Sequence, residues 1–153
     1  MAQVKNVRLE VLNNKVRVTG RLEFGQVEVG QQYAIKIFIF ADDTGEGNTL
    51  SLGPLYTFKF GEPQFAPAGS GPQLFSLSKS ITAAPTVGVD ETDRLDLSKL
   101  NEDPGKHLEH VGGVIVPVQD QDEVYAAIKL FKSTDLHTAI ATGKSEIVSG
   151  VFV

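Results

Sequence analysis

Histidine and carboxylate side chains come closest together in the segment His107-Leu108-Glu109-His110. Neutral imidazole nitrogens and a carboxylate are ligands that suit zinc and similar ions. His137 would add a third imidazole if the fold brings it near. The segment has no helical frame that would aim both rings at one point, and this spacing is common by chance. We therefore interpret these histidines as solvated loop residues and keep His107, Glu109 and His110 as weak candidates for metal ligands.

Carboxylates also gather in two predicted loops, which contain Asp42, Asp43 and Glu46 in one and Asp120, Asp122 and Glu123 in the other. Loops at one end of a β-sandwich can hold calcium between carboxylate and carbonyl oxygens. The glycines nearby miss the register of an EF-hand, and solubilising turns account for both clusters. The weak calcium candidates are Asp42, Asp43, Asp120 and Asp122. A third acidic run, at residues 90–96, is interpreted as a solvated loop.

Two short motifs look like fragments of catalytic or phosphate-binding sites. Residues 141–145 end in Gly-Lys-Ser as a P-loop does, but its first glycine would fall at Thr138 and no helix is expected to follow. We interpret them as a turn. Residues 69–71 read Gly-Ser-Gly, but Ala68 stands where a nucleophile elbow needs glycine. The chain has no cysteine, so a thiolate nucleophile is excluded. We predict no catalytic residues and no cofactor.

The clearest structural signal is a hairpin near the N-terminus. Residues 7–11 and 16–19 alternate apolar and polar side chains, and the two asparagines between them suit a two-residue turn, because asparagine tolerates positive φ. With that loop, Glu10 faces Arg17 as an opposite-charge pair across the strands. The second strand is expected to continue past Gly20, which would form a bulge.

The strongest predicted strand covers residues 33–41. One face carries a tyrosine and three isoleucines, and the other carries Phe38 and Phe40 beside Lys36. In a two-sheet sandwich one face of each strand meets water, and two adjacent exposed phenylalanines form a patch that soluble monomers usually avoid. We therefore predict that Phe38 and Phe40 form an interface covered by a second subunit, with residues 82–113 of the same chain as the alternative cover.

Further strands are expected at residues 55–60, 74–81, 114–116, 123–131, 137–142 and 146–153. Residues 123–130 also have helical propensity, but Tyr125 and Phe131 follow a period of two and the neighbouring segments are strands. Residues 82–113 are expected to be irregular, with one short helical turn near 95–100. Eight or nine short strands predict an all-β domain spanning residues 1–153, an antiparallel two-sheet sandwich of immunoglobulin-like or jelly-roll type.

Composition excludes several classes of protein. The apolar fraction of 41% and the charged fraction of 22% are those of a globular chain. The net charge of −5 argues against general binding to nucleic acid. The sequence contains no run of about 18 apolar residues, the length that a membrane-spanning helix needs. The first residues lack the apolar stretch of a signal peptide, so a cytoplasmic location is expected.

These observations favour a non-catalytic β-sandwich module that binds a protein partner or assembles with itself, with a homo-oligomer as the preferred arrangement. The alternative is a domain that binds a carbohydrate or another small molecule among loops at one end, with or without calcium. Tyr33, Tyr56 and Tyr125 would then be the candidate platforms for a sugar ring. An enzyme assembled from distant residues ranks third.

Overall fold

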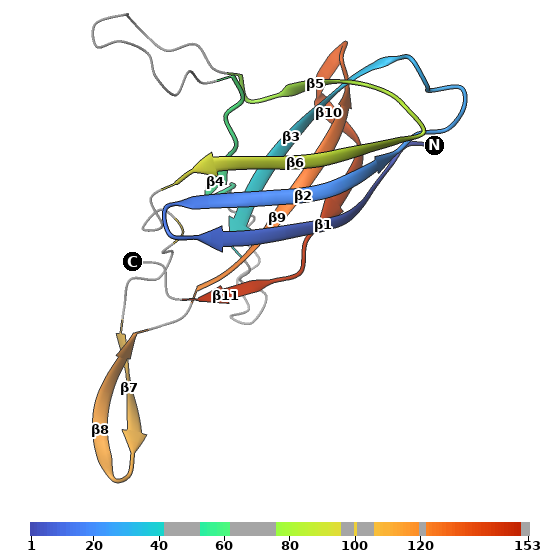
Figure 1. Cartoon of the computed structure of the whole chain (residues 1–153). Helices are drawn as coiled ribbons and strands as arrows, with labels where there is room; N and C mark the ends of the chain where they lie inside the picture. Colours follow the sequence, from blue (N-terminus) through green and yellow to red (C-terminus); the bar gives the residue numbers. More distant parts are fainter. Residues whose placement is uncertain (42–52, 62–75, 96–99, 101–105, 120–121, 151–153) are drawn as a thin grey trace, which may run out of the picture.

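The computed structural model describes residues 1–41, 53–61, 76–95, 100, 106–119 and 122–150 (Figure 1). Over these residues the chain forms two antiparallel sheets of three and six strands, with a separate two-stranded hairpin. In Figure 1 the strands of the smaller sheet run across those of the larger one at a steep angle. The prediction of an all-β two-sheet sandwich is confirmed. None of the described segments is a helix long and apolar enough to cross a membrane.

The three-stranded sheet has the order β1-β2-β6 and consists of β1 (Gln3–Leu12), β2 (Lys15–Glu23) and β6 (Thr86–Arg94). The predicted hairpin and its register are confirmed, with Glu10 opposite Arg17. The turn differs from the expected two-residue turn with left-handed asparagines, because Asn14 has a nearly extended φ of 158°. The bulge lies between Lys5 and Arg8 in β1, where Asn6 has φ 56°, and Gly20 of β2 is the residue opposite it. Asparagine tolerates this left-handed conformation better than most residues.

The six-stranded sheet contains β3 (Gln32–Ala41), β4 (Tyr56–Thr57), β5 (Lys79–Thr82), β9 (Asp122–Lys132), β10 (Asp135–Lys144) and β11 (Val148–Gly150). Its central path is β10-β9-β3-β4, while β5 pairs with β3 and β11 pairs with β9. The predictions of strands at 33–41, 123–131 and 137–142 are confirmed. The one at 55–60 was too long, because only β4 forms there, and of the described residues 76–81 only 79–81 lie in a strand, β5.

The core lies between the two sheets and is built from the inward-facing positions of both. The fully buried side chains are Val16, Val18, Leu22, Ile35, Ile37, Ile39, Phe58, Leu100, Val124, Ile128 and Leu130. Two glycines mark where the sheets approach most closely. A Cβ atom on Gly20 would lie 2.8 Å from Ile128 Cδ1, and one on Gly143 would lie 2.7 Å from Val4 Cγ1. At Gly143 the Val4 carbonyl oxygen would also lie within 2.9 Å, so this position needs glycine, whereas at Gly20 the close atom is the end of a flexible side chain.

The segment 82–113 is more regular than predicted. β6 spans nine of its residues and pairs with β2 over its full length. β7 (Lys106–Val111) pairs with β8 (Val114–Gln119) as a two-stranded hairpin that extends away from the sandwich in Figure 1. The predicted strand at 114–116 is therefore confirmed and longer. Most of the helical turn predicted near 95–100 lies outside the described residues.

Candidate functional site

The outer face of the six-stranded sheet carries an unusual set of side chains. Its register places Lys36 opposite Lys129, and Phe40 opposite Tyr125, on the central strands β3 and β9. Successive residues of a strand alternate between faces, so these positions share the face that points away from the core. On β3 that alternation is direct, because Ile35, Ile37 and Ile39 are fully buried on the inner side.

Three half-buried rings form an aromatic cluster on this face: Phe38, Phe40 and Tyr125. The ring centroids of Phe38 and Phe40 lie 5.8 Å apart, and those of Phe40 and Tyr125 lie 5.5 Å apart with planes inclined by 24°. Such spacings are those of favourable aromatic pairs. The cluster joins residues that are 85 positions apart in sequence, because Phe40 and Tyr125 face each other across β3 and β9.

Lysine ammonium groups lie over these rings. Lys129 Nζ is 5.5 Å from the centroid of Phe38 and 5.9 Å from that of Phe40. Lys144 Nζ is 5.7 Å from the Tyr125 ring, and Lys36 Nζ is 4.9 Å from the Phe131 ring. These are cation–π distances. Within the described part of the chain, no ion pair joins Lys36, Lys129 or Lys144 to a carboxylate.

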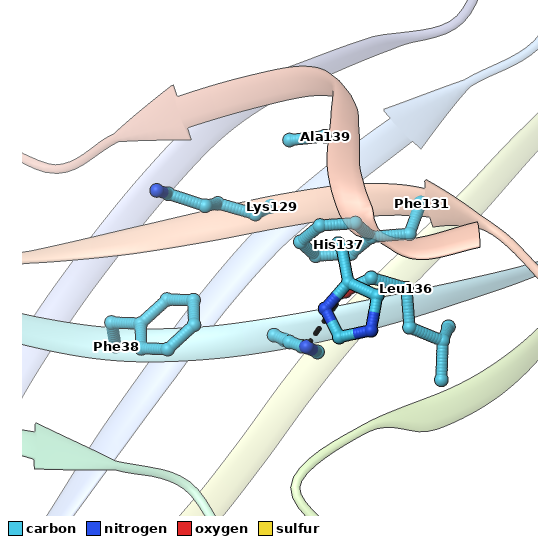
Figure 2. Close-up of a pocket in the computed structure, with 7 residues that line it drawn as sticks. Phe38, Lys129, Phe131, Leu136, His137 and Ala139 are labelled. Carbon is cyan, nitrogen blue, oxygen red and sulfur yellow. Dashed lines mark hydrogen bonds between the residues drawn. The ribbon is translucent and has the colours of Figure 1, made fainter.

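An open pocket of about 320 Å³ lies beside the aromatic cluster (Figure 2). Its lining residues are Lys36, Phe38, Lys129, Phe131, Leu136, His137 and Ala139. The register of β10 on β9 shifts between Asp135 and Ala139. Bulges of this kind redirect side chains, and here the bulged segment supplies the pocket wall above β9, as Figure 2 shows.

Hydrogen bonds fix the bulged segment over the pocket. Lys36 Nζ donates to the carbonyl oxygen of Leu136 at 2.8 Å. The Asp135 carboxylate accepts hydrogen bonds from the backbone N–H groups of His137 and Thr138, at 3.0 and 3.3 Å. These bonds hold the pKa of Asp135 below its usual range, the bond from His137 first. Asp135 therefore bonds to the backbone of its own segment and forms no ion pair with Lys36 or Lys129.

Residues 141–145, which end like a phosphate-binding loop in sequence, do not form one in the structure. Residues 141–144 belong to β10 and pair with residues 127–130 of β9, so they form neither a phosphate loop nor the expected turn. No helix follows Ser145, whose hydroxyl instead accepts a hydrogen bond from the N–H of Ala126 at 2.8 Å. Gly143 is explained by the close approach of β1.

The third acidic run is not the solvated loop that we predicted, since three of its carboxylates lie on β6. Asp90 pairs with Arg17, Glu91 with Lys79, and Asp93 accepts hydrogen bonds from the Tyr56 hydroxyl and the Lys59 N–H. Glu91 and Asp93 follow the alternation of Val87 and Val89, whose partners are on the inner side of β2. They tie the rims of the two sheets together and are structural.

The remaining metal candidates stay predictions. The structure describes only the backbone of His107, Glu109 and His110, which lie on β7 opposite β8, and of Asp122 at the start of β9. The candidates Asp42, Asp43, Glu46 and Asp120, and the Gly-Ser-Gly motif at 69–71, lie outside the described residues. Among the residues that are described, no group of three or more His, Asp or Glu side chains is arranged to hold a metal.

Sequence reasoning named Phe38 and Phe40 but missed Lys129 and Lys144 as their companions. A signal was present, because Lys36, Phe38 and Phe40 share one phase of β3, and Tyr125, Lys129 and Phe131 share one phase of β9. Joining the two sets required the pairing of β3 with β9, which no local pattern gives.

Comparisons with known proteins leave the family open. No protein-family model matches the sequence, and a comparison with curated proteins finds no match. One solved structure that resembles the chain is β-glucosidase 3B from Thermotoga neapolitana in complex with glucose, at 9% identity and a TM-score of 0.36. That alignment covers 97% of this chain and 16% of the β-glucosidase. A likeness of this level carries no argument about function.

Proposed function

We propose that this domain is a non-catalytic β-sandwich module that binds a protein partner through the outer face of its six-stranded sheet. The observation that carries the proposal is the aromatic cluster of Phe38, Phe40 and Tyr125, half-buried and continuous with an open pocket. Aromatic side chains are enriched at the centres of protein interfaces, where they bury a large area with little loss of conformational entropy. A cytoplasmic location stays part of the proposal.

Charge favours a different protein over a second copy packed face to face. Pairing two identical faces would bring Lys36, Lys129 and Lys144 of one subunit against the same lysines of the other. Like charges placed together across an interface oppose binding. A homo-oligomer therefore stays a prediction, one that requires this face to meet another, acidic part of the second copy.

The test is selection of peptides from a random display library on the immobilised protein. We expect peptides that bind the wild type and lose most of their affinity for Phe38→Ser, because that change removes the ring that the cluster shares with the pocket lining. Phe60→Ser is the matched control, since Phe60 is also half-buried but packs against the core. If every selected peptide binds Phe38→Ser as well as the wild type, the face is not the binding surface.

Light scattering of the wild type over a wide range of concentration complements the selection. We expect a constant mass. A dimer that Phe38→Ser dissociates into folded monomers would replace a separate partner with a second copy of this chain.

A further inference from the structure

The pocket beside the aromatic cluster has the chemistry of a carboxylate site. Two lysines line it, Lys36 from β3 and Lys129 from β9, together with the exposed His137. No described carboxylate is within ion-pair distance of either lysine, although the chain as a whole carries a net charge of −5. Positive charge with no counter-charge among the described residues, on an acidic protein, favours an anionic partner at this face.

Lys36 and Lys129 both keep N–H donors that no described residue uses. An ammonium group carries three N–H donors, and Lys36 uses one of them on the Leu136 carbonyl. Lys129 makes no hydrogen bond within the described structure and rests over the rings of Phe38 and Phe40. From opposite positions on β3 and β9, Lys36 reaches toward the Leu136 carbonyl and Lys129 reaches toward Phe38 and Phe40. Each lysine keeps free N–H donors, so an anion in the pocket can accept a hydrogen bond from either one.

The pocket walls narrow the class of anion. Phe38, Phe131, Leu136 and Ala139 are apolar, so the ligand must present apolar surface next to its charge. A free inorganic anion would leave these walls unused. A glutamate or aspartate side chain of a protein partner, with apolar neighbours, satisfies both the lysines and the walls.

Single-stranded nucleic acid fits this face less well. Proteins that bind it offer open ring faces on which bases stack, within a positively charged groove. Here Phe40 and Tyr125 stack on each other, and lysine side chains lie over the rings of the cluster. The negative net charge also repels a polyanion.

We infer that this pocket binds an acidic side chain of an extended partner segment, whose apolar residue two positions away packs on the aromatic cluster. The spacing follows from β3, because Lys36, Phe38 and Phe40 succeed one another at steps of two residues, roughly 6.5 Å each. An extended segment lying along β3 presents alternate side chains at the same step. The inference rests on the proposed function and adds the partner's chemistry to it: an acidic residue, any residue, then an aromatic or aliphatic one.

The experiment measures binding of synthetic peptides to the purified protein by calorimetry at low ionic strength. The first peptide repeats Glu-Ser-Phe-Ser, the second repeats Gln-Ser-Phe-Ser, and the third repeats Glu-Ser-Ala-Ser. We expect the first to bind on the order of tenfold more tightly than the second, since a charge-assisted hydrogen bond is lost with the carboxylate. The third should bind more weakly than the first as well.

Variants assign the effect to the pocket. Lys129→Gln should bring the affinities for the Glu and Gln peptides close together, while Phe38→Ser should weaken both by a similar factor. The matched control is Lys15→Gln, which removes one exposed positive charge from β2, on the other sheet. Its preference for the Glu peptide should equal that of the wild type.

The outcomes separate this inference from the proposed function. Peptide binding that depends on Phe38 but does not distinguish Glu from Gln would overturn the carboxylate site and leave the binding face in place. Absence of any binding that depends on Phe38 would overturn both. If oligothymidylate bound more tightly than the Glu peptide and lost this affinity in Lys129→Gln, the ligand would be single-stranded nucleic acid and the inference would be wrong. Competition by millimolar inorganic phosphate as strong as that by the Glu peptide would also overturn the inference, by making the site one for free anions.

Discussion

The two outer faces of the sandwich differ in how their charges are used. On the three-stranded sheet, Arg17 binds Asp90 through two hydrogen bonds of 2.9 and 2.7 Å, and Lys5 pairs with Glu23 at 3.0 Å. On the six-stranded sheet, Lys36 and Lys129 face each other without a described carboxylate. Opposite charges across neighbouring strands stabilise the first face, whereas on the second face the lysine ammonium groups lie over aromatic rings. We expect this difference if the second face binds a partner, as proposed.

Aromatic content follows the same division. The outer positions of the first sheet include Arg8, Glu10, Arg17, Thr19 and Arg21, which are polar. The outer positions of β3 and β9 bring together the rings of the aromatic cluster. Both sheets contribute apolar side chains to one core. The two sheets therefore differ in the side chains that they expose, and the proposed binding of a partner would require such a difference.

The largest expected effect comes from a change that disturbs the packing on which both faces depend. Gly143→Val should lower the free energy of unfolding by about 3 kcal/mol, because overpacked cores must shift their backbone. The new Cβ would lie 2.7 Å from Val4 Cγ1 and 2.9 Å from the Val4 carbonyl oxygen. Gly88→Val on β6 is the control, since nothing lies within 4 Å of its Cβ position. Urea unfolding checks both, and equal stabilities would refute the close approach of β1 and β10.

A smaller effect is expected in the coupling energies of two charge pairs, one on each sheet. Double-mutant cycles should give attraction between Arg17 and Asp90 and weak repulsion, about 0.3 kcal/mol, between Lys36 and Lys129. The hydrogen bonds from Arg17 lower the pKa of Asp90 in the folded state. The attraction is thus fully present above the pKa of the unfolded chain and is lost as pH falls through the folded pKa. An attractive coupling between the two lysines would mean that a hidden counter-charge joins them.

Local patterns in the sequence predicted the elements whose contacts are local. The β1–β2 hairpin was recovered with its register because alternation and the Asn13-Asn14 turn both act over a few residues. The strand β3 was recovered because its inner face is uniformly apolar. The strand β6 was missed because Glu91 and Asp93 occupy apolar-phase positions, and their partners Lys79 and Tyr56 come from the other sheet.

The candidate site was only half predictable for the same reason. Phe38 and Phe40 stood out on β3, but their relation to Lys129 depends on a pairing between strands about 90 residues apart. The pocket also depends on a register shift in β10, which no turn residue in the sequence predicts. Non-local pairing and bulges are set by the packing of the whole sandwich, so a single sequence read locally does not reveal them.

We propose that the face formed by β3, β9 and β10 binds a partner and that the face formed by β1, β2 and β6 does not. A titration of isotopically labelled protein with the Glu-Ser-Phe-Ser peptide, followed by the chemical shifts of the backbone amides, tests this difference. We predict that the shifts concentrate at Lys36, Phe38, Lys129 and His137, and that the amides of β2 stay unchanged. Shifts centred on Arg17, or spread evenly over both sheets, would contradict the account.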